Sequence, residues 1–457
     1  LCNQEGIMVW QDFMFACMMY PSDNEFLESI KEEIEYNIKR LRNHPSLVLW
    51  CGNNEILEGF HFWGWKEQLG VHADDAMRSY KKIFYEIIPE TLKSLDPEKP
   101  YHPSSPSSSY SGIPALHSGD FHFWDIIKKP LPLSAYEENV GRFMSEFGFK
   151  SYPEIKTIRS YAHEPDFDIR SEVIEFHQGW DTGADLVERH VKEQFGVAES
   201  FTKFLYLSQL TQAQAIKTAI EAQRRLKPYC MGSLFWQLND CWPCASWSAI
   251  DYFGRWKALM YELKHLFADV MISPAVRNNK LEVYVVSDIP VALKLRVLLR
   301  LMNFEGVVHF EKEVEFQTRK PGSEMIFSIP MEKLNITNLK DQVVFVAEVF
   351  DENRRLDRNL LYFVRPADLL LKAENPEIKI SESGNKAMIF LRSTVLLKNV
   401  YLENPDVEGF FSDNFFDLLP GESKPVIFQA NDSNCNESCF TVQSLGSLIN
   451  PPFRPDI

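Results

Sequence analysis

The stretch Ser46-Leu-Val-Leu-Trp-Cys-Gly-Asn-Asn-Glu55 decides the fold class. Its first residues form a short apolar run, which is typical of a strand buried on both faces. Asn54 and Glu55 come shortly after this run, so two polar side chains follow the carboxyl end of the strand. A second strand-like segment, Gly141–Phe147, also ends in a carboxylate, that of Glu146. The carboxyl ends of the strands are where α/β-barrel enzymes place their active sites.

Apolar strands and amphipathic helices alternate through the first part of the chain. A helix is predicted from Asp23 to Asn43, because Asp23 is a good N-cap residue and apolar residues recur at helical spacing after it. Further strands are expected at Gly6–Asp12, Lys99–His102, Ala115–Phe123 and Tyr229–Trp236, and further helices at Ala76–Leu95 and Phe201–Leu226, the last with Ala and Gln on its exposed turns. Repeated β-α units form a parallel sheet with helices outside.

The six strands predict an incomplete (β/α)8 TIM barrel that lacks its first two units. Since the chain begins with Leu1, we expect it to be the later part of a longer protein. After Pro274, period-2 alternation of apolar residues indicates two β-sandwich domains of the immunoglobulin-like kind. The expected fold class is therefore multidomain, α/β plus all-β: a catalytic barrel at 1–272, a β-sandwich at 273–365 and a C-terminal immunoglobulin-like sandwich at 366–457.

The charge pattern narrows the choice of partner. The net charge is −16 and no basic cluster stands out, which argues against nucleic acid or an anionic membrane surface. The sequence contains no apolar stretch long enough to span a bilayer. Cys241-x-x-Cys244 has no second such pair to complete a zinc site, so we expect neither a metal nor a cofactor. A neutral ligand such as a sugar fits this composition.

The two strand-end glutamates suggest a reaction. A single glutamate in such a position is usually a solvated or salt-bridged surface group, so neither is informative by itself. Together, Glu55 and Glu146 can face each other across the mouth of a barrel. Carboxyl groups roughly 5–5.5 Å apart support retaining glycoside hydrolysis, in which one is the nucleophile and the other transfers protons. The acid of such a pair needs a raised pKa, which a neighbouring anion favours.

Longer motifs carry a family resemblance. Gly6–Cys17, Trp50–Glu55, His117–Trp124, Arg142–Gly148 and Phe235–Pro243 resemble the strand ends of glycoside hydrolase family 2, specifically its β-mannosidase branch. The resemblance covers essentially the whole chain. It implies a retaining exo-β-mannosidase that releases terminal non-reducing β-D-mannose by double displacement. The substrates it implies are β-mannoside oligosaccharides or glycan-derived mannosides.

The same resemblance assigns roles to individual residues. Glu55 is the expected acid/base and Glu146 the expected nucleophile, while Asn54 is expected to bind the sugar 2-hydroxyl. The other expected substrate contacts are Asp12, Trp63, His122, Trp124 and Trp236, the last as the floor under the sugar. For Asp12 a structural hydrogen-bonding role, and for Trp63 a packing role, stay open. No metal ligand is expected among them.

Two alternatives stay open. One is a β-galactosidase or β-glucuronidase of the same family. The other is a catalytically dead carbohydrate-binding fragment, because the family's N-terminal domain contributes to the sugar pocket. We accordingly expect the 457-residue chain alone to be insoluble or inactive. The compartment also stays open between lysosome, periplasm and secretion.

Overall fold

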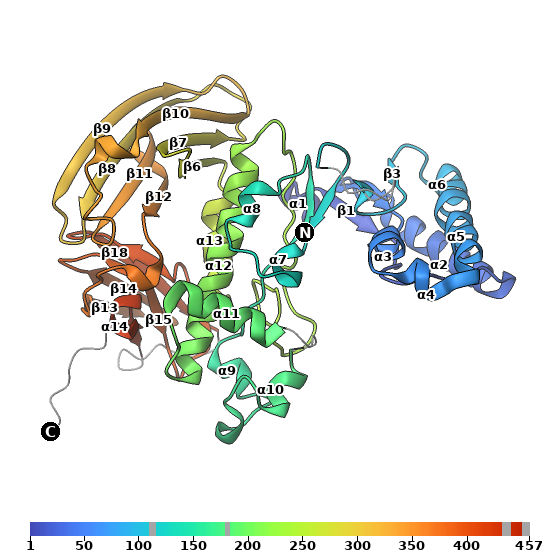
Figure 1. Cartoon of the computed structure of the whole chain (residues 1–457), viewed down its shortest axis with the longest axis horizontal. Helices are drawn as coiled ribbons and strands as arrows, with labels where there is room; N and C mark the ends of the chain where they lie inside the picture. The colour runs from blue at the N-terminus through green and yellow to red at the C-terminus, as the bar shows by residue number, and fades with distance from the viewer. Residues whose placement is uncertain (109–115, 179–182, 432–439, 450–457) are drawn as a thin grey trace. The chain divides into compact units, whose positions relative to one another are not determined.

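A computed structural model of the chain describes residues 1–108, 116–178, 183–431 and 440–449 (Figure 1). The chain divides into two compact units. The first consists of Leu1–Phe123, Asn139–Phe147 and Tyr229–Leu234, and the second of Trp124–Glu138, Gly148–Pro228 and Phe235–Ile457. Each unit is described separately below.

The first unit contains the parallel strands that the sequence predicts. Strands β1 (Val9–Asp12), β2 (Leu47–Cys51) and β3 (Tyr101–His102) form one parallel sheet in that order. Strands β4 (Phe121–Phe123) and β5 (Met144–Phe147) form a second parallel pair. Beyond β5, the segment 231–234 continues the parallel arrangement through backbone hydrogen bonds with residues 142–144. Carboxyl ends of neighbouring strands therefore meet at a common edge within each sheet.

Helices of the first unit follow β1 and β2. Helix α2 (Asn24–Leu41) is capped by Asp23, whose side chain accepts from the Phe26 N–H at 3.0 Å, as the sequence predicts. Its residues at 30, 34 and 38 are buried against the sheet core. After β2 come α3 (Ile56–Phe62), α4 (Trp65–Leu69), α5 (Ala73–Lys81), the π-helix η2 (Lys82–Ile87) and α6 (Ile88–Leu95), while α1 (Cys2–Glu5) precedes β1.

Several predicted strands are longer than the observed ones. Gly6–Asp12 is a strand only from Val9, and Ala115–Phe123 only from Phe121, with residues 109–115 outside the described part. The predicted strand Tyr229–Trp236 contains an isolated bridge at Ser233 and no regular strand. Regular pairing is therefore confined to residues near the carboxyl ends, where the polar side chains follow.

The second unit begins with helices. These are α7 (Asp125–Lys128), α8 (Ala135–Glu138), α9 (Ile155–Ile158), α10 (Glu172–Phe176), α11 (Gly183–Phe195), α12 (Phe201–Arg225) and α13 (Ala258–Leu266). The expectation that Ala and Gln of α12 are exposed is wrong: Ala215, Ala219, Gln209 and Gln212 are all buried. The reason is that helices α8, α11 and α13 all pack against α12. Polar side chains buried in this way need hydrogen-bond partners. Gln212 accordingly donates to backbone carbonyls of Phe149, Trp247 and Ser248.

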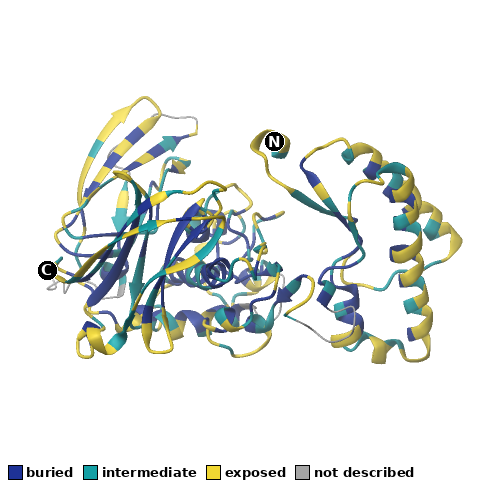
Figure 2. Ribbon diagram, turned by 90° about the horizontal axis from the view of Figure 1, so that it is seen from above, coloured by how far each residue is buried: buried dark blue, intermediate teal, exposed yellow. Residues whose placement is uncertain are grey.

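The first β-sandwich follows α13. One sheet has the order β10-β7-β6, from β6 (Val270–Arg277), β7 (Lys280–Ser287) and β10 (Gly322–Pro330). The other has the order β12-β11-β8-β9, from β8 (Lys294–Asn303), β9 (Val308–Gln317), β11 (Val343–Asp351) and β12 (Arg354–Tyr362). Buried residues alternate with partly exposed ones along most of β8, and Figure 2 shows such alternation in the sandwich strands. This is the period expected when one face of a sheet covers a core.

A second sandwich completes the described chain. Its sheets have the orders β13-β14-β18-β16 and β17-β15-β19. The strands are β13 (Glu377–Ser383), β14 (Lys386–Arg392), β15 (Leu397–Glu403), β16 (Gly409–Phe411), β17 (Phe416–Leu418), β18 (Ser423–Ala430) and β19 (Thr441–Gln443), followed by α14 (Leu445–Ile449). The predicted turn at Pro420-Gly421 precedes β18, where Gly421 has a φ of 76° that favours glycine.

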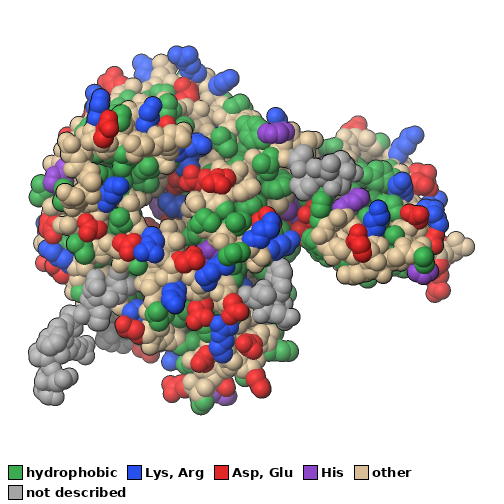
Figure 3. Space-filling model, viewed as in Figure 1, with side chains coloured by type: hydrophobic (Ala, Val, Ile, Leu, Met, Phe, Trp, Pro, Cys, Tyr) green, Lys and Arg blue, Asp and Glu red, His purple; other side chains and the backbone are tan. Residues whose placement is uncertain are grey.

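The surface gives no sign of a single-sign field on the face drawn in Figure 3, where Lys and Arg side chains are interspersed with Asp and Glu. Among the described helices, none is long and apolar enough to cross a membrane.

Strand β11 offers a test of the sandwich core. Phe345 is fully buried there, so we expect Phe345→Ala to cost about 3–5 kcal/mol of local stability through the cavity it leaves. Amide hydrogen exchange of residues 343–351, measured by mass spectrometry, should accelerate by about 100-fold or more. Phe390→Ala, at a position that is 39% exposed, is the matched control and should change little. Unchanged exchange in the Phe345 variant would mean that this residue is not part of a packed core.

Candidate active site

The segment after β2 turns sharply to place Glu55. Gly52 lies so close to the next strand that a Cβ there would meet the Pro103 carbonyl oxygen at 2.3 Å, so glycine is required. Glu55 itself has a φ of 59°, a left-handed conformation that costs a non-glycine residue on the order of 1 kcal/mol. The Glu55 N–H donates to the Ser105 carbonyl at 2.7 Å and holds this conformation. Unfavourable backbone geometry of this kind is typical of functional residues.

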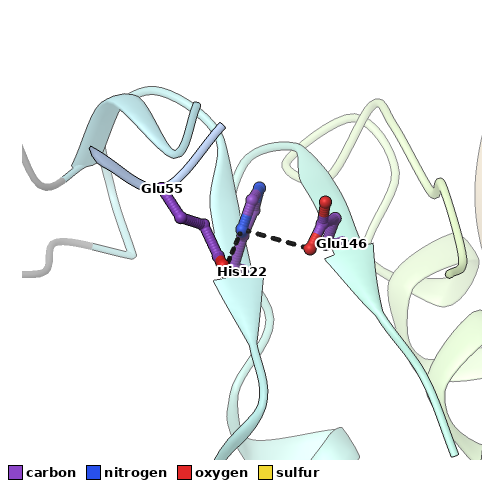
Figure 4. A group of neighbouring side chains, drawn as sticks. All are labelled: Glu55, His122 and Glu146. Carbon is purple, nitrogen blue, oxygen red and sulfur yellow. Dashed lines mark hydrogen bonds and ion pairs between the residues drawn. The ribbon is translucent and has the colours of Figure 1, made fainter. Parts of the chain in front are cut away.

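The other two members of the site come from β4 and β5. His122 and Glu146 are register partners on these neighbouring parallel strands, so their side chains lie on the same face of the pair. His122 Nδ1 lies 2.9 Å from Glu55 Oε1 and 3.4 Å from Glu146 Oε2. Figure 4 shows the imidazole between the two carboxylates. One oxygen of each glutamate and the histidine nitrogen all lie within 4.8 Å of one another.

All three side chains are largely shielded from water. The exposed fraction is 3% for His122, 10% for Glu55 and 14% for Glu146. Burial by itself lowers the pKa of His122, but the charges of Glu146, Glu55 and Asp120, together with the hydrogen bond to Glu55, outweigh it and raise the pKa. The imidazole is therefore held toward its protonated form by the anions around it.

A serine and an aspartate behind His122 were not predicted from the sequence. Ser105 Oγ lies 2.9 Å from His122 Nε2 and donates to Asp120 Oδ2 at 2.7 Å. Asp120 also accepts from Ser107 and Ser145, and its Oδ1 lies 3.3 Å from His102 Nε2. Burial alone raises the pKa of Asp120, but hydrogen bonds from His102 and the serines hold the pKa well below its usual range. Asp120 is therefore a buried, ionised acceptor.

The other predicted site residues of the first unit are Asp12, Asn54 and Trp63, and each has defined contacts. Asp12, at the end of β1, accepts from Trp10 Nε1 at 2.8 Å, and burial raises the pKa of Asp12. Its carboxyl also interacts electrostatically with His122. The bond from Trp10 fits the structural alternative, and the sugar contact of Asp12 stays a prediction. The backbone of Asn54 forms isolated parallel β-bridges to Ala16 on one side and Ser105 on the other. Trp63 ends α3 and packs edge-on against Trp65, with ring centroids 5.5 Å apart, which is the packing role left open for it.

Cys17 is a further neighbour that sequence reasoning did not single out. Its Sγ donates to Glu55 Oε2 at 3.6 Å. Burial, followed by the charge of Glu55, raises the pKa of Cys17 to about 12, so the thiol stays protonated and can act as a donor. Both carboxylate oxygens of Glu55 therefore have a polar contact, Oε1 with His122 and Oε2 with Cys17.

Trp124 and Trp236 belong to the second unit. Both lie against Gly148, where a Cβ would meet the Trp236 carbonyl at 2.3 Å and the Trp124 ring at 2.9 Å. A side chain at residue 148 is excluded by this close approach. The sugar-binding roles of both tryptophans stay predictions.

The spacing of Glu55, His122 and Glu146 could accommodate a metal ion geometrically. The 2.9 Å separation of His122 Nδ1 and Glu55 Oε1 is that of an ordinary charge-assisted hydrogen bond. The expectation that these residues hold no metal stays a prediction. Among the described cysteines, Cys241 and Cys244 are free thiols.

Comparisons with known families match three parts of the chain. The model of the glycosyl hydrolases family 2 TIM barrel domain matches residues 1–107. A mannosidase Ig/CBM-like domain matches residues 279–368, and an Ig-fold domain of mannosidases matches residues 373–448. The predicted order of a barrel domain and two immunoglobulin-like sandwiches is thereby confirmed, while the boundaries at residues 272 and 365 stay predictions.

Individual relatives agree with these matches. The β-mannosidase of Bos taurus is 29% identical over 94% of this chain, and that of Capra hircus is 30% identical over the same share. The crystal structure of the β-D-mannosidase from Dictyoglomus thermophilum aligns with a TM-score of 0.85 and 32% identity, over 97% of this chain and 53% of that one. The exo-chitosanase CsxA of Amycolatopsis orientalis, at 13% identity and a TM-score of 0.69, shares the fold. The chain spans about half the length of the curated relatives it matches, 52% for the bovine and caprine enzymes.

These matches relate the chain to glycoside hydrolase family 2, whose TIM barrel domain model matches residues 1–107. Within it, the chain is similar over nearly its whole length to the C-terminal portion of β-mannosidases, as its motifs predict.

Asp120 allows a test of the buried network. We expect Asp120→Asn to lower the free energy of unfolding at pH 7 by about 2 kcal/mol, because several donors lose a charged acceptor. The pKa of Asp120 is lower in the folded state than the ordinary 3.8, so its stabilisation is present above that value and is lost as the pH falls toward the folded pKa. Urea unfolding should therefore show that Asp120→Asn is less stable than the parent at pH 7, and that this difference in the free energy of unfolding is smaller at about pH 3.

The exposed Asp74→Asn is the control and should match the parent at both pH values. A deficit for Asp120→Asn that is equally large at both pH values would contradict an ionised Asp120.

Proposed function

We propose that the chain carries the catalytic residues of a retaining exo-β-mannosidase. One observation supports this most strongly: oxygens of Glu55 and Glu146 lie within 4.8 Å of each other. That separation suits double displacement, for which the carboxyl groups lie roughly 5–5.5 Å apart, rather than inversion, which needs roughly 6.5–9.5 Å. The similarity to named β-mannosidases supports the choice of sugar.

The proposed reaction uses the two glutamates in turn. Glu146 attacks the anomeric carbon while Glu55 protonates the departing glycosidic oxygen, which leaves a mannosyl ester on Glu146. Glu55 then removes a proton from water, the water oxygen attacks the anomeric carbon and the ester bond breaks. Two inversions give net retention. Glu146, with 14% exposure, is desolvated enough to be nucleophilic yet accessible to substrate.

The other residues bind the sugar in this proposal. Asn54, next to the acid, donates to the 2-hydroxyl, a contact that strengthens in the transition state. The similarity to β-mannosidases supports Trp63, Trp124 and Trp236 as further sugar contacts, with Trp236 as the floor under the sugar. Asp12 holds a further hydroxyl while accepting from Trp10.

Substitution of the nucleophile is the first test. In protein whose parent form hydrolyses p-nitrophenyl β-mannoside, Glu146→Ala should remove nearly all turnover, because no glycosyl-enzyme can form. Added azide should not restore a product of retained configuration. Turnover near the parent rate in this variant would exclude Glu146 as the nucleophile.

Substitution of the acid/base should behave differently. We expect Glu55→Ala to lower kcat for mannosides with poor leaving groups by about 10²–10⁴-fold, since these need protonation. Activated aryl mannosides should be affected far less in the first step, and azide should yield β-mannosyl azide. Rescue by azide in the Glu146 variant and not in the Glu55 variant would exchange the two roles.

The choice of sugar has its own measurement. Initial rates with p-nitrophenyl β-mannoside, β-galactoside and β-glucuronide should favour the mannoside by at least 100-fold. Dominant turnover of either other glycoside would replace the β-mannosidase assignment, and binding without turnover of all three would favour a carbohydrate-binding fragment.

A further inference from the structure

The hydrogen bonds behind His122 determine which of its nitrogens carries a fixed proton. A serine hydroxyl has one proton, and Ser105 Oγ lies 2.7 Å from Asp120 Oδ2. Since Asp120 is an ionised acceptor, the Ser105 proton must point to it. The Ser105 oxygen can then only accept at its other contact, the one 2.9 Å from His122 Nε2. Nε2 therefore carries a hydrogen whether the imidazole is neutral or charged.

The opposite nitrogen is the one that can change. His122 Nδ1 faces Glu55 Oε1 at 2.9 Å and Glu146 Oε2 at 3.4 Å. With Nε2 fixed, one further proton can reside on Nδ1 or on Glu55, and both arrangements preserve the same hydrogen bond. The two residues therefore act as a pair that holds a single exchangeable proton.

Resting on the function proposed above, we infer that Ser105 and Asp120 are positioning residues that fix the tautomer of His122, so that His122 stores the proton which Glu55 delivers to the leaving oxygen. His122 acts through Glu55 and does not itself protonate the substrate. Neither Ser105 nor Asp120 is placed in contact with the sugar.

The proton balance of each step follows. In the first step, the Glu55–His122 pair loses one proton to the glycosidic oxygen, the anomeric carbon–oxygen bond breaks and Glu146 forms its ester bond. The pair is left as a Glu55 carboxylate beside a neutral His122 with hydrogen on Nε2. In the second step, water gives one proton back to the pair as its oxygen attacks the anomeric carbon and Glu146 departs as a carboxylate.

Esterification of Glu146 couples the proton transfer from the Glu55–His122 pair to the first chemical step. The Glu146 charge is the strongest of the influences that raise the pKa of His122, followed by the hydrogen bond to Glu55 and the charges of Glu55 and Asp120. Formation of the ester removes the Glu146 charge, so His122 holds its proton less strongly at the moment the leaving oxygen needs one. Among the described residues, the other titratable groups that face this trio are Asp120 from behind, Asp12 in electrostatic contact with His122, and the Cys17 thiol, which donates to Glu55.

Histidine NMR tests the fixed tautomer without requiring turnover. In protein labelled with ¹⁵N-histidine, the His122 signals are assigned by their absence in His122→Gln. Nε2 should show a directly bonded proton at every pH at which the protein is folded, and Nδ1 should be the nitrogen that loses its proton as the pH rises. Ser105→Ala should release this constraint and give mixed tautomers, and Ser105→Thr should restore it because the hydroxyl is kept.

Kinetics test the consequence for catalysis. Ser105→Ala should lower kcat/KM about 10–100-fold for a β-mannoside with a poor leaving group, and little for 2,4-dinitrophenyl β-mannoside, which needs no protonation. The basic limb of its pH–rate profile should move to lower pH, and Ser105→Thr should recover both. Ser104→Ala is the matched control, because Ser104 is also fully buried but donates to Asn53 at 2.9 Å.

The two experiments separate the possible failures. Hydrogen on Nδ1 and none on Nε2 in the neutral parent protein would overturn the inference, as would a Ser105→Ala loss that is equal for both leaving groups. Absence of turnover in the parent protein would count against the proposed function, and the NMR result would still decide the tautomer. If Ser105→Ala does not fold, the tautomer of His122 in the parent protein decides the inference by itself.

Discussion

Two carboxylates whose oxygens lie within 4.8 Å, both largely shielded from water, repel each other unless positive charge lies between them. A proton shared with His122 lessens this repulsion, because one imidazole nitrogen lies within hydrogen-bonding distance of Glu55 and close to Glu146. The register of β4 on β5 puts His122 beside Glu146, and the left-handed turn at Glu55 brings the third group to them. Each of these local features is explained by the requirement to hold one proton between two anions.

The parts of the fold that local patterns specify were predictable. Asp23 and the helical spacing after it specify α2, and the apolar run before Asn54 specifies β2, in both cases to within one or two residues. Alternation in the later part of the chain specifies the sandwich strands, whose inner faces form two cores. These elements are predictable because burial on one face leaves a periodic signal in the sequence.

Features that depend on tertiary contacts were not predictable. Ala and Gln on α12 suggest an exposed surface, yet three further helices cover it and Gln212 bonds to backbone carbonyls. Likewise, Glu55 and Glu146 follow recognisable strands, whereas Ser105 and Asp120 lie in segments without a periodic pattern. Their roles depend on the contact between Ser105 and His122, which are far apart in the sequence. A short strand around His122 with polar residues on the preceding loop was the available signal.

Mechanism-based labelling tests the central claim most directly. A 2-deoxy-2-fluoro-β-mannosyl fluoride loses fluoride to the nucleophile, and the fluorine at carbon 2 slows hydrolysis of the resulting ester. Peptide mass spectrometry should then find one fluoromannosyl group, attached to Glu146, and prior incubation with mannose should reduce the labelling. A label on Glu55, or steady turnover of mannosides with no covalent adduct at Glu146, would contradict the assignment of this glutamate as the nucleophile.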